Sequence, residues 1–195
     1  MKQILFIHGG DSFATREAMM EYWKTESVEN PFRQDTKRRK WKDDLREVLV
    51  GEFAFAAPRM PNHMNAHYDE WSMWFEKFVP FLNNGDILIG YSLGANFLAK
   101  YLSENTLPIY LSQLHLVSGC FGEGDFTLSG SLENISVQTE KIYIYHSQDD
   151  EIVPVADAAK FKKALPKASM CIFDNRGHFF NEESFPELVA NIRHG

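Results

Sequence analysis

The stretch DILIGYSLGANFLAKYL, residues 86–102, joins a short apolar run to a longer amphipathic one through the pentapeptide Gly90-Tyr91-Ser92-Leu93-Gly94. The apolar run predicts a buried strand over residues 86–90, and the following pattern predicts a helix over residues 93–103. Small residues flank Ser92, as a tight and strained turn requires, because side chains at positions 90 and 94 would crowd the neighbouring backbone. The stretch therefore predicts a strand–turn–helix unit that presents the serine hydroxyl above the end of a sheet.

The same alternation of short apolar runs and amphipathic runs extends along the whole chain. Further strands are predicted over residues 3–8, 52–57, 113–118, 141–146 and 168–173, and several are apolar at nearly every position, as strands buried on both faces are. Helices are predicted over residues 41–49, 67–82, 155–165 and 184–193. This order predicts an α/β fold, a three-layer α/β/α sandwich with a mostly parallel sheet of about six strands.

An aromatic stripe marks the predicted helix over residues 67–82. Its members recur at helical spacing: Trp71, Trp74, Phe75, Phe78 and Leu82. Such a stripe can serve as a platform for a ligand or as the face that packs on a sheet. We favour packing, because an apolar stripe of this width is typical of a helix that covers a core.

The composition limits the kind of protein this can be. The chain has 195 residues, 44% of them hydrophobic and 24% charged, which suits a single domain over residues 1–195. Its net charge of −7 argues against nucleic acid or an anionic membrane as a partner. We find neither a secretory signal nor a membrane span, and two cysteines make no disulfide framework, so we expect a cytoplasmic protein.

A charged stretch at about residues 25–50 departs from the βα alternation. Its basic residues are Arg33, Lys37, Arg38, Arg39, Lys40 and Lys42. They are open to two interpretations: a docking patch for an acidic partner, or a solvated surface excursion that ends in the helix WKDDLREVL. We favour the excursion, because charge runs are usually solvated faces.

Ser92 becomes a nucleophile only if a base accepts its proton. His178 follows the last predicted strand, and Asp149 and Asp150 follow the strand over residues 141–146. The carboxyl ends of parallel strands meet at one edge of a sheet, so we expect Ser92, an aspartate and His178 to converge there. The order Ser, Asp, His is that of an α/β-hydrolase triad, but residue types alone leave the choice between the two aspartates open.

The glycines after the first strand supply a further element of such a site. Acyl transfer needs two backbone N–H groups directed at the oxyanion that develops on the carbonyl oxygen. We expect one from Leu93, the residue after the nucleophile, and the other from Gly10 in the turn His8-Gly9-Gly10. The alternative is a glycine turn that serves only the strand-to-helix geometry.

These motifs together resemble the α/β-hydrolase superfamily, in particular small single-domain serine hydrolases similar to retinoblastoma-binding protein 9. The resemblance rests on HGG at 8–10, APRMPN at 57–62, GYSLG at 90–94, DEIVP at 150–154 and GHF at 177–179. It implies Ser92 as nucleophile, His178 as general base and acid, and Asp150 as orienting carboxylate, because the acid precedes Val-Pro by three residues. It also implies a reduced fold without the two leading strands and with a minimal lid over about residues 120–139. Tyr91 departs from the His of many relatives, and a change in pocket lining is the expected consequence.

The residues and the resemblance together predict a carboxylesterase-like serine hydrolase (EC 3.1.1). It would cleave a small ester, with a thioester or an amide as further candidates, and would need no cofactor and no metal. The alternative is a protein-interaction module on a hydrolase scaffold, with vestigial or secondary activity. Only the basic residues 33–42 favour it.

Other histidines are weaker candidates. His63 and His67 have the spacing of a helical metal-binding pair, but Pro61 and Asn62 indicate a loop and no third ligand is evident. His115 lies within a predicted strand and is expected to be a hydrogen-bonded core residue. His146 ends a strand near Asp150 and is open to two roles, lining the site or making hydrogen bonds within the loop, of which we favour the second.

Overall fold

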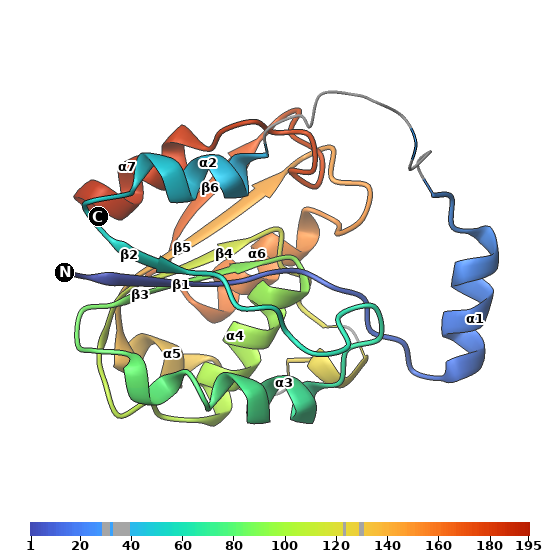
Figure 1. Ribbon diagram of the computed structural model, residues 1–195, viewed down its shortest axis with the longest axis horizontal. Helices are drawn as coiled ribbons and strands as arrows, with labels where there is room; N and C mark the ends of the chain where they lie inside the picture. Colours follow the sequence, from blue (N-terminus) through green and yellow to red (C-terminus); the bar gives the residue numbers. More distant parts are fainter. Residues whose placement is uncertain (29–31, 33–39, 123, 129–130) are drawn as a thin grey trace.

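The computed structural model describes residues 1–28, 32, 40–122, 124–128 and 131–195 (Figure 1). Six strands form one sheet: β1 Gln3–Ile7, β2 Ala54–Ala56, β3 Ile87–Tyr91, β4 Leu111–Val117, β5 Thr139–Ser147 and β6 Ser169–Phe173. The helices are α1 Arg16–Thr25, α2 Trp41–Val48, α3 Tyr68–Phe75, α4 Leu93–Glu104, α5 Glu133–Gln138, α6 Ala156–Ala164 and α7 Pro186–His194. Short 3₁₀ turns cover Val79–Phe81 and Gly124–Phe126.

The sheet is parallel throughout, in the strand order β2-β1-β3-β4-β5-β6. All six predicted strands are present, and each agrees with its predicted range to within two residues at either end. The predicted mostly parallel sheet of about six strands is therefore confirmed. Because the strands are parallel, all their carboxyl ends lie at one edge, where Ser92 follows β3.

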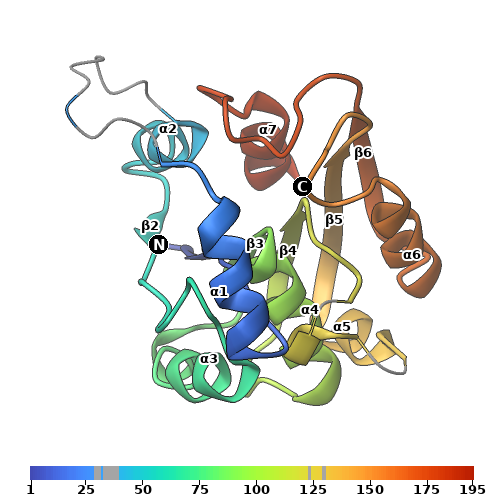
Figure 2. The same ribbon diagram turned by 90° about the vertical axis from the view of Figure 1, so that its right-hand side faces the viewer.

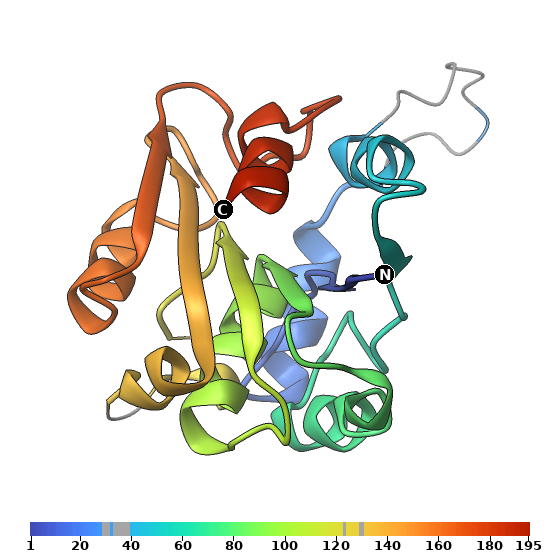
Figure 3. The ribbon, with the colours of Figure 1, turned by 90° about the vertical axis from the view of Figure 1, so that its left-hand side faces the viewer.

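Helices cover both faces of the sheet. α2 and α7 lie on one face, and α3, α4 and α5 on the other (Figures 1 and 3). Side chains alternate along β1 accordingly: Leu5 and Ile7 join the core beneath α3 and α4, whereas Ile4 and Phe6 join the core beneath α2 and α7. This two-sided burial explains why the strands are apolar at nearly every position, and it confirms the three-layer sandwich.

The helix predicted over residues 67–82 is shorter than expected. α3 ends at Phe75, and a 3₁₀ turn, Val79–Phe81, follows. Pro80 accounts for the difference, because it has no N–H to donate within a helix and its ring crowds the preceding turn. Trp71 and Phe75 are fully buried in the core, which confirms packing as the role of these two aromatics.

Two helices were not predicted, and α1 is the more consequential. Its N-terminus is capped by Thr15, whose hydroxyl accepts a hydrogen bond from the Ala18 N–H at 3.1 Å. Met19 is the only buried residue among the ten of α1. The helix stands beyond the carboxyl ends of the strands in Figure 1 and crosses in front of that edge in Figure 2. The segment after β1 therefore covers part of the edge at which Ser92 lies.

The glycines beside Ser92 permit close contacts between backbones. A Cβ on Gly94 would collide with the carbonyl oxygen of Ile7 and would lie 2.6 Å from that of His8. We therefore expect Gly94→Ala to lower the free energy of unfolding by about 3 kcal/mol, the upper part of the range for overpacking. Urea denaturation measures this loss in the free energy of unfolding. The control is Gly122→Ala, whose Cβ would have the Thr127 methyl as its nearest neighbour, at 3.2 Å; equal losses of stability in the two variants would contradict this explanation.

Candidate active site

Ser92 occupies the sharp turn between β3 and α4. Its backbone has φ 53° and ψ −125°, a conformation that L-residues seldom adopt and that is stored as strain. The Ser92 N–H donates to the Val117 carbonyl at 2.8 Å, so the end of β4 supports the turn. The predicted strand–turn–helix unit is thus present, with a half-buried serine at the carboxyl edge of the sheet.

Ser92, His178 and Asp150 lie in one hydrogen-bonded line. The Nε2 atom of His178 is 2.9 Å from the Ser92 Oγ atom. The Nδ1 atom of the same ring is 2.8 Å from Oδ2 and 3.0 Å from Oδ1 of Asp150. A carboxylate at Nδ1 favours the tautomer that carries its proton there, which leaves Nε2 free to accept the serine proton. His178 is only 5% and Asp150 8% exposed, so bulk water is largely excluded from this line.

The Asp150 carboxylate is held by its own loop. Its Oδ1 atom accepts hydrogen bonds from the N–H groups of Ile152 at 3.0 Å and Val153 at 2.9 Å. Burial alone would raise the pKa of this carboxyl, but the hydrogen bonds from His178 and the two N–H groups outweigh it and place the pKa below its usual range. His146 Nε2 donates to the Val153 carbonyl at 2.8 Å, the favoured role within the loop, and the same atom lies 3.5 Å from Asp150 Oδ2.

Asp149 has a different role from its neighbour. Its Oδ1 atom accepts hydrogen bonds from the Ser147 hydroxyl at 2.5 Å and from the Gly177 N–H at 2.9 Å. These bonds lower the pKa of the Asp149 carboxyl. Asp149 therefore ties the loop after β5 to the loop that carries His178, whereas Asp150 is the acid that contacts the imidazole.

The turn after β1 lies directly beside Ser92. A Cβ on Gly9 would sit 2.9 Å from the Ser92 Cβ atom, so only glycine fits this approach. Within the residues that the structure describes, the backbone N–H groups of Gly10 and Leu93 donate no hydrogen bond. Leu93 directly follows Ser92, and Gly10 directly follows the glycine that touches it, so the two predicted oxyanion donors are chain neighbours of this contact.

His8 supports this turn, a role that the sequence did not indicate. Its Nε2 atom accepts a hydrogen bond from the Met60 N–H at 2.8 Å, so the ring proton is on Nδ1 and is donated to the Gly9 carbonyl at 2.6 Å. Burial lowers the pKa of His8 and outweighs the hydrogen bond to Gly9, which keeps the ring in this neutral form. His8 therefore joins the glycine turn to the segment after β2.

Tyr91 lies beneath the histidine rather than on an open pocket wall. Its side chain is 3% exposed, and its hydroxyl donates to the His178 backbone carbonyl at 2.7 Å. Burial, together with the negative charge of Asp150, raises the pKa of Tyr91, so the hydroxyl remains a donor. The Lys42 ammonium lies 4.6 Å from the centre of the tyrosine ring. Tyr91 therefore does not line an exposed pocket, which differs from the expectation. Its hydroxyl instead fixes the backbone of the loop that carries His178.

The remaining predicted histidines do not join this site. His115 is fully buried between the Tyr145 hydroxyl at 3.0 Å and the Gln113 side-chain oxygen at 2.7 Å. Burial lowers its pKa to about 3, which confirms a satisfied, neutral core histidine. No three His, Cys, Asp or Glu side chains in the described ranges are grouped to hold a metal ion, and His67 instead pairs with Asp125 at 3.2 Å.

The basic stretch is only partly described by the structure. Arg33, Lys37, Arg38 and Arg39 lie outside the described residues. Lys40 donates to the Phe180 carbonyl at 2.7 Å. The helix predicted at the end of the stretch is α2, and it packs on the sheet through the fully buried Trp41, Leu45 and Leu49. In the described part of the chain no helix combines the length and the apolar character that a membrane crossing needs.

Solved structures with the same fold cover nearly the whole chain. The ydeN gene product from B. subtilis is 19% identical, with a TM-score of 0.79 over 99% of this chain and 97% of that one. A protein named as a YdeN-like hydrolase from Pectobacterium atrosepticum is 13% identical, with a TM-score of 0.66 over 97% and 88% of the two chains. Esterase PE8 is 16% identical, with a TM-score of 0.61 over 98% and 91%. No protein-family model matches the chain, nor does any curated protein sequence. The chain has the α/β-hydrolase fold.

Proposed function

We propose that this protein is a serine hydrolase that cleaves small esters through an acyl-enzyme on Ser92. The observation that carries the proposal is the line from Ser92 Oγ through His178 to Asp150, with contacts of 2.9 Å and 2.8 Å. The strained serine backbone and the unpaired N–H groups of Gly10 and Leu93 support the same chemistry. The fold, which it shares with proteins named as a hydrolase and an esterase, adds support.

In the first half-reaction, the Ser92 Oγ atom attacks the ester carbonyl carbon as His178 Nε2 accepts the hydroxyl proton. The negative charge that develops on the carbonyl oxygen is received by the N–H groups of Gly10 and Leu93. Asp150 stabilises the imidazolium and holds its orientation. The bond from carbon to the leaving oxygen then breaks, and the leaving alkoxide takes the proton from Nε2.

In the second half-reaction, water replaces the alcohol. His178 Nε2 accepts a proton from the water, whose oxygen attacks the acyl carbon, and the same two N–H groups bind the second oxyanion. The bond to Ser92 Oγ breaks as the proton returns to the serine. The products are the carboxylic acid and the free enzyme. A thioester follows the same course with a thiol as leaving group, and we extend the proposal to thioesters.

A panel of substrates tests this function. We expect measurable turnover of p-nitrophenyl acetate and butyrate and of an acetyl thioester, and slower turnover of the matching anilide, whose amine is a poorer leaving group. Release of nitrophenolate, thiol or nitroaniline is followed spectrophotometrically. A folded protein that turns over none of these esters or thioesters faster than buffer would contradict the proposal.

Tyr91→Phe tests how far catalysis depends on the hydrogen bond from the Tyr91 hydroxyl to the His178 backbone carbonyl. The variant removes the hydroxyl that donates to the His178 carbonyl at 2.7 Å and leaves that buried acceptor unpaired. Such a loss costs roughly 1–3 kcal/mol, and we expect kcat to fall about tenfold with KM nearly unchanged. The matched control is Tyr145→Phe, which removes a buried hydroxyl bonded instead to His115 and Asn191. If both variants lose the same kcat, Tyr91 has no particular role in positioning His178.

A further inference from the structure

A cavity of about 550 Å³ opens beside the glycine turn. It lies between α1, which contributes Trp23, and the segment 62–67, and Glu70 of α3 closes one side. Figures 1 and 2 show α1 standing in front of the carboxyl edge of the sheet, so the cavity lies on the side of the molecule where Ser92 is found.

Backbone contacts join the cavity wall to the candidate oxyanion turn. The Asp11 N–H donates to the His63 carbonyl at 2.8 Å, and the Asp11 carbonyl accepts from the Ala66 N–H at 2.7 Å. A Cβ on Gly10 would collide with the His63 carbonyl oxygen, which places this wall against the residue whose N–H we assign to the oxyanion. The cavity wall therefore lies next to Gly10 in the fold, while Ser92, Leu93 and His178 lie outside the described lining.

The wall is fixed before any ligand arrives. The Ser12 hydroxyl donates to the Ala66 carbonyl at 3.0 Å, and the Asn65 N–H donates to the Asn62 carbonyl at 2.8 Å. The Trp71 indole N–H donates to the Pro61 carbonyl at 2.8 Å. A preformed wall lowers the ordering cost of binding, which is a property of built ligand sites.

The lining combines one carboxylate, Glu70, with the indole of Trp23 and two histidines, His63 and His67. The Glu70 carboxylate is held in place by the Asn62 side-chain amide at 2.8 Å. The Trp23 ring, 41% exposed, belongs to the lining on the α1 side. A carboxylate and an indole both favour a cation.

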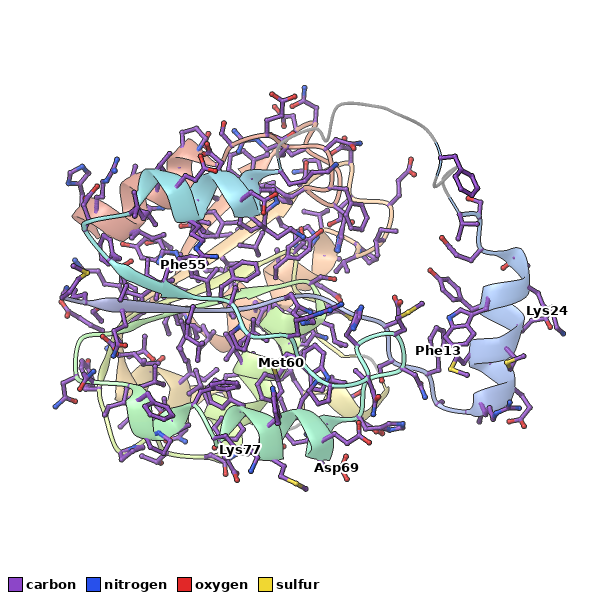
Figure 4. The ribbon with its side chains drawn as sticks, viewed as in Figure 1. Phe13, Lys24, Phe55, Met60, Asp69 and Lys77 are labelled. Carbon is purple, nitrogen blue, oxygen red and sulfur yellow. The ribbon has the colours of Figure 1, made fainter. Side chains whose placement is uncertain are left out.

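No lysine or arginine belongs to the described lining of the cavity. Lys24, which follows Trp23 in α1, points away from the body of the molecule in Figure 4. His67 pairs with Asp125 rather than with Glu70. Neither a lysine nor an arginine of the described lining therefore cancels the negative charge of Glu70.

We propose that this cavity is a subsite for an ammonium group, primary or quaternary, carried by the ester substrate. This inference rests on the proposed hydrolase function and narrows its substrate class to esters and thioesters with a cationic group a few bonds from the carbonyl. Glu70 supplies the countercharge, and Trp23 supplies the π-face.

Two pairs of isosteric substrates test the subsite through turnover. Acetylthiocholine and 3,3-dimethylbutyl thioacetate differ only in the charge of the leaving group. The p-nitrophenyl esters of 4-(trimethylammonio)butanoic and 5,5-dimethylhexanoic acids differ only in the charge of the acyl group. For one pair we expect kcat/KM to favour the cationic member by about tenfold, the scale of one cation–π contact aided by a carboxylate. Equal kcat/KM within both pairs would overturn the subsite but leave the hydrolase intact.

Neighbouring acids of α3 provide the matched variants. Glu70 lines the cavity, whereas the adjacent Asp69 is exposed, is not part of the lining and projects from the outer side of α3 in Figure 4. We expect Glu70→Gln to abolish most of the preference for the cationic member and Asp69→Asn to retain it. Equal losses in both variants would show a long-range charge effect, not a subsite, and would overturn the proposal.

Direct binding separates this inference from the proposed catalysis. We expect isothermal titration to detect choline binding to the wild type and to Ser92→Ala, with an affinity at least about tenfold above that of neutral 3,3-dimethylbutanol. Glu70→Gln should lose this difference, and Asp69→Asn should keep it. Choline binding without turnover would refute the hydrolase proposal and retain the cation site. Turnover without choline binding would refute the cation site and retain the hydrolase proposal.

Discussion

Ser92→Ala is expected to lower kcat for p-nitrophenyl acetate by about 10⁶-fold, the loss seen when the nucleophile of a serine triad is removed. The reason is the geometry at this one hydroxyl, which lies 2.9 Å from the Nε2 atom of the buried His178. Alanine leaves the N–H groups of Gly10 and Leu93 in place, so only the slow attack of water on a bound ester remains. Quenched, fixed-time assays at high enzyme concentration measure the remaining rate of ester hydrolysis by the variant.

A second serine provides the control for this variant. Ser118 follows β4 as Ser92 follows β3, it also has a positive φ, 45°, and its buried hydroxyl has no hydrogen-bond partner among the residues that the structure describes. We expect Ser118→Ala to retain kcat within a few-fold of the wild type. The nucleophile assignment is contradicted if Ser92→Ala stays within tenfold of the wild type while it remains folded.

Asp150→Asn is expected to lower kcat by roughly 10⁴-fold. The asparagine amide would donate where the carboxylate accepts, and it would favour the His178 tautomer with its proton on Nε2, which cannot accept from Ser92. Asp149→Asn should lose less than about tenfold, because an asparagine oxygen can still accept from the Ser147 hydroxyl and the Gly177 N–H.

The two aspartate variants are compared by kcat and by urea denaturation together. We expect Asp150→Asn to lose activity out of proportion to stability, whereas any loss of activity in Asp149→Asn should accompany a loss of stability from the weaker contact between the two loops. A larger loss of kcat in Asp149→Asn than in Asp150→Asn would show that the other acid orients the histidine.

The strands and the serine turn could be predicted because local physics determines them. Strands buried on both faces must be apolar at nearly every position, and Gly90 and Gly94 stand where the elbow admits no Cβ. The choice of Asp150 over Asp149 needed more than residue types, because both follow β5. In the structure the N–H of Val153, three residues after Asp150, donates a hydrogen bond to the Asp150 Oδ1 atom. Asp149 instead accepts hydrogen bonds from Ser147 and Gly177.

Features that depend on distant contacts were not predictable. The Tyr91 hydroxyl meets the carbonyl of a residue 87 positions away, and His8 meets the Met60 N–H 52 positions away. Neither contact leaves a pattern in the sequence. α1 buries only Met19 of its ten residues, so its apolar residues do not specify where the helix packs, and its placement over the carboxyl edge depends on the rest of the fold.

The central claim is that Ser92 is an activated nucleophile, and labelling by a fluorophosphonate probe tests it most directly. Attack of Ser92 Oγ on phosphorus expels fluoride and leaves a stable covalent adduct, and an activated serine is needed for it. We predict that the wild type is labelled at Ser92, identified by peptide mass spectrometry, and that folded Ser92→Ala is not labelled. A folded wild type that resists the probe, or a Ser92→Ala protein that is labelled equally, would contradict the account.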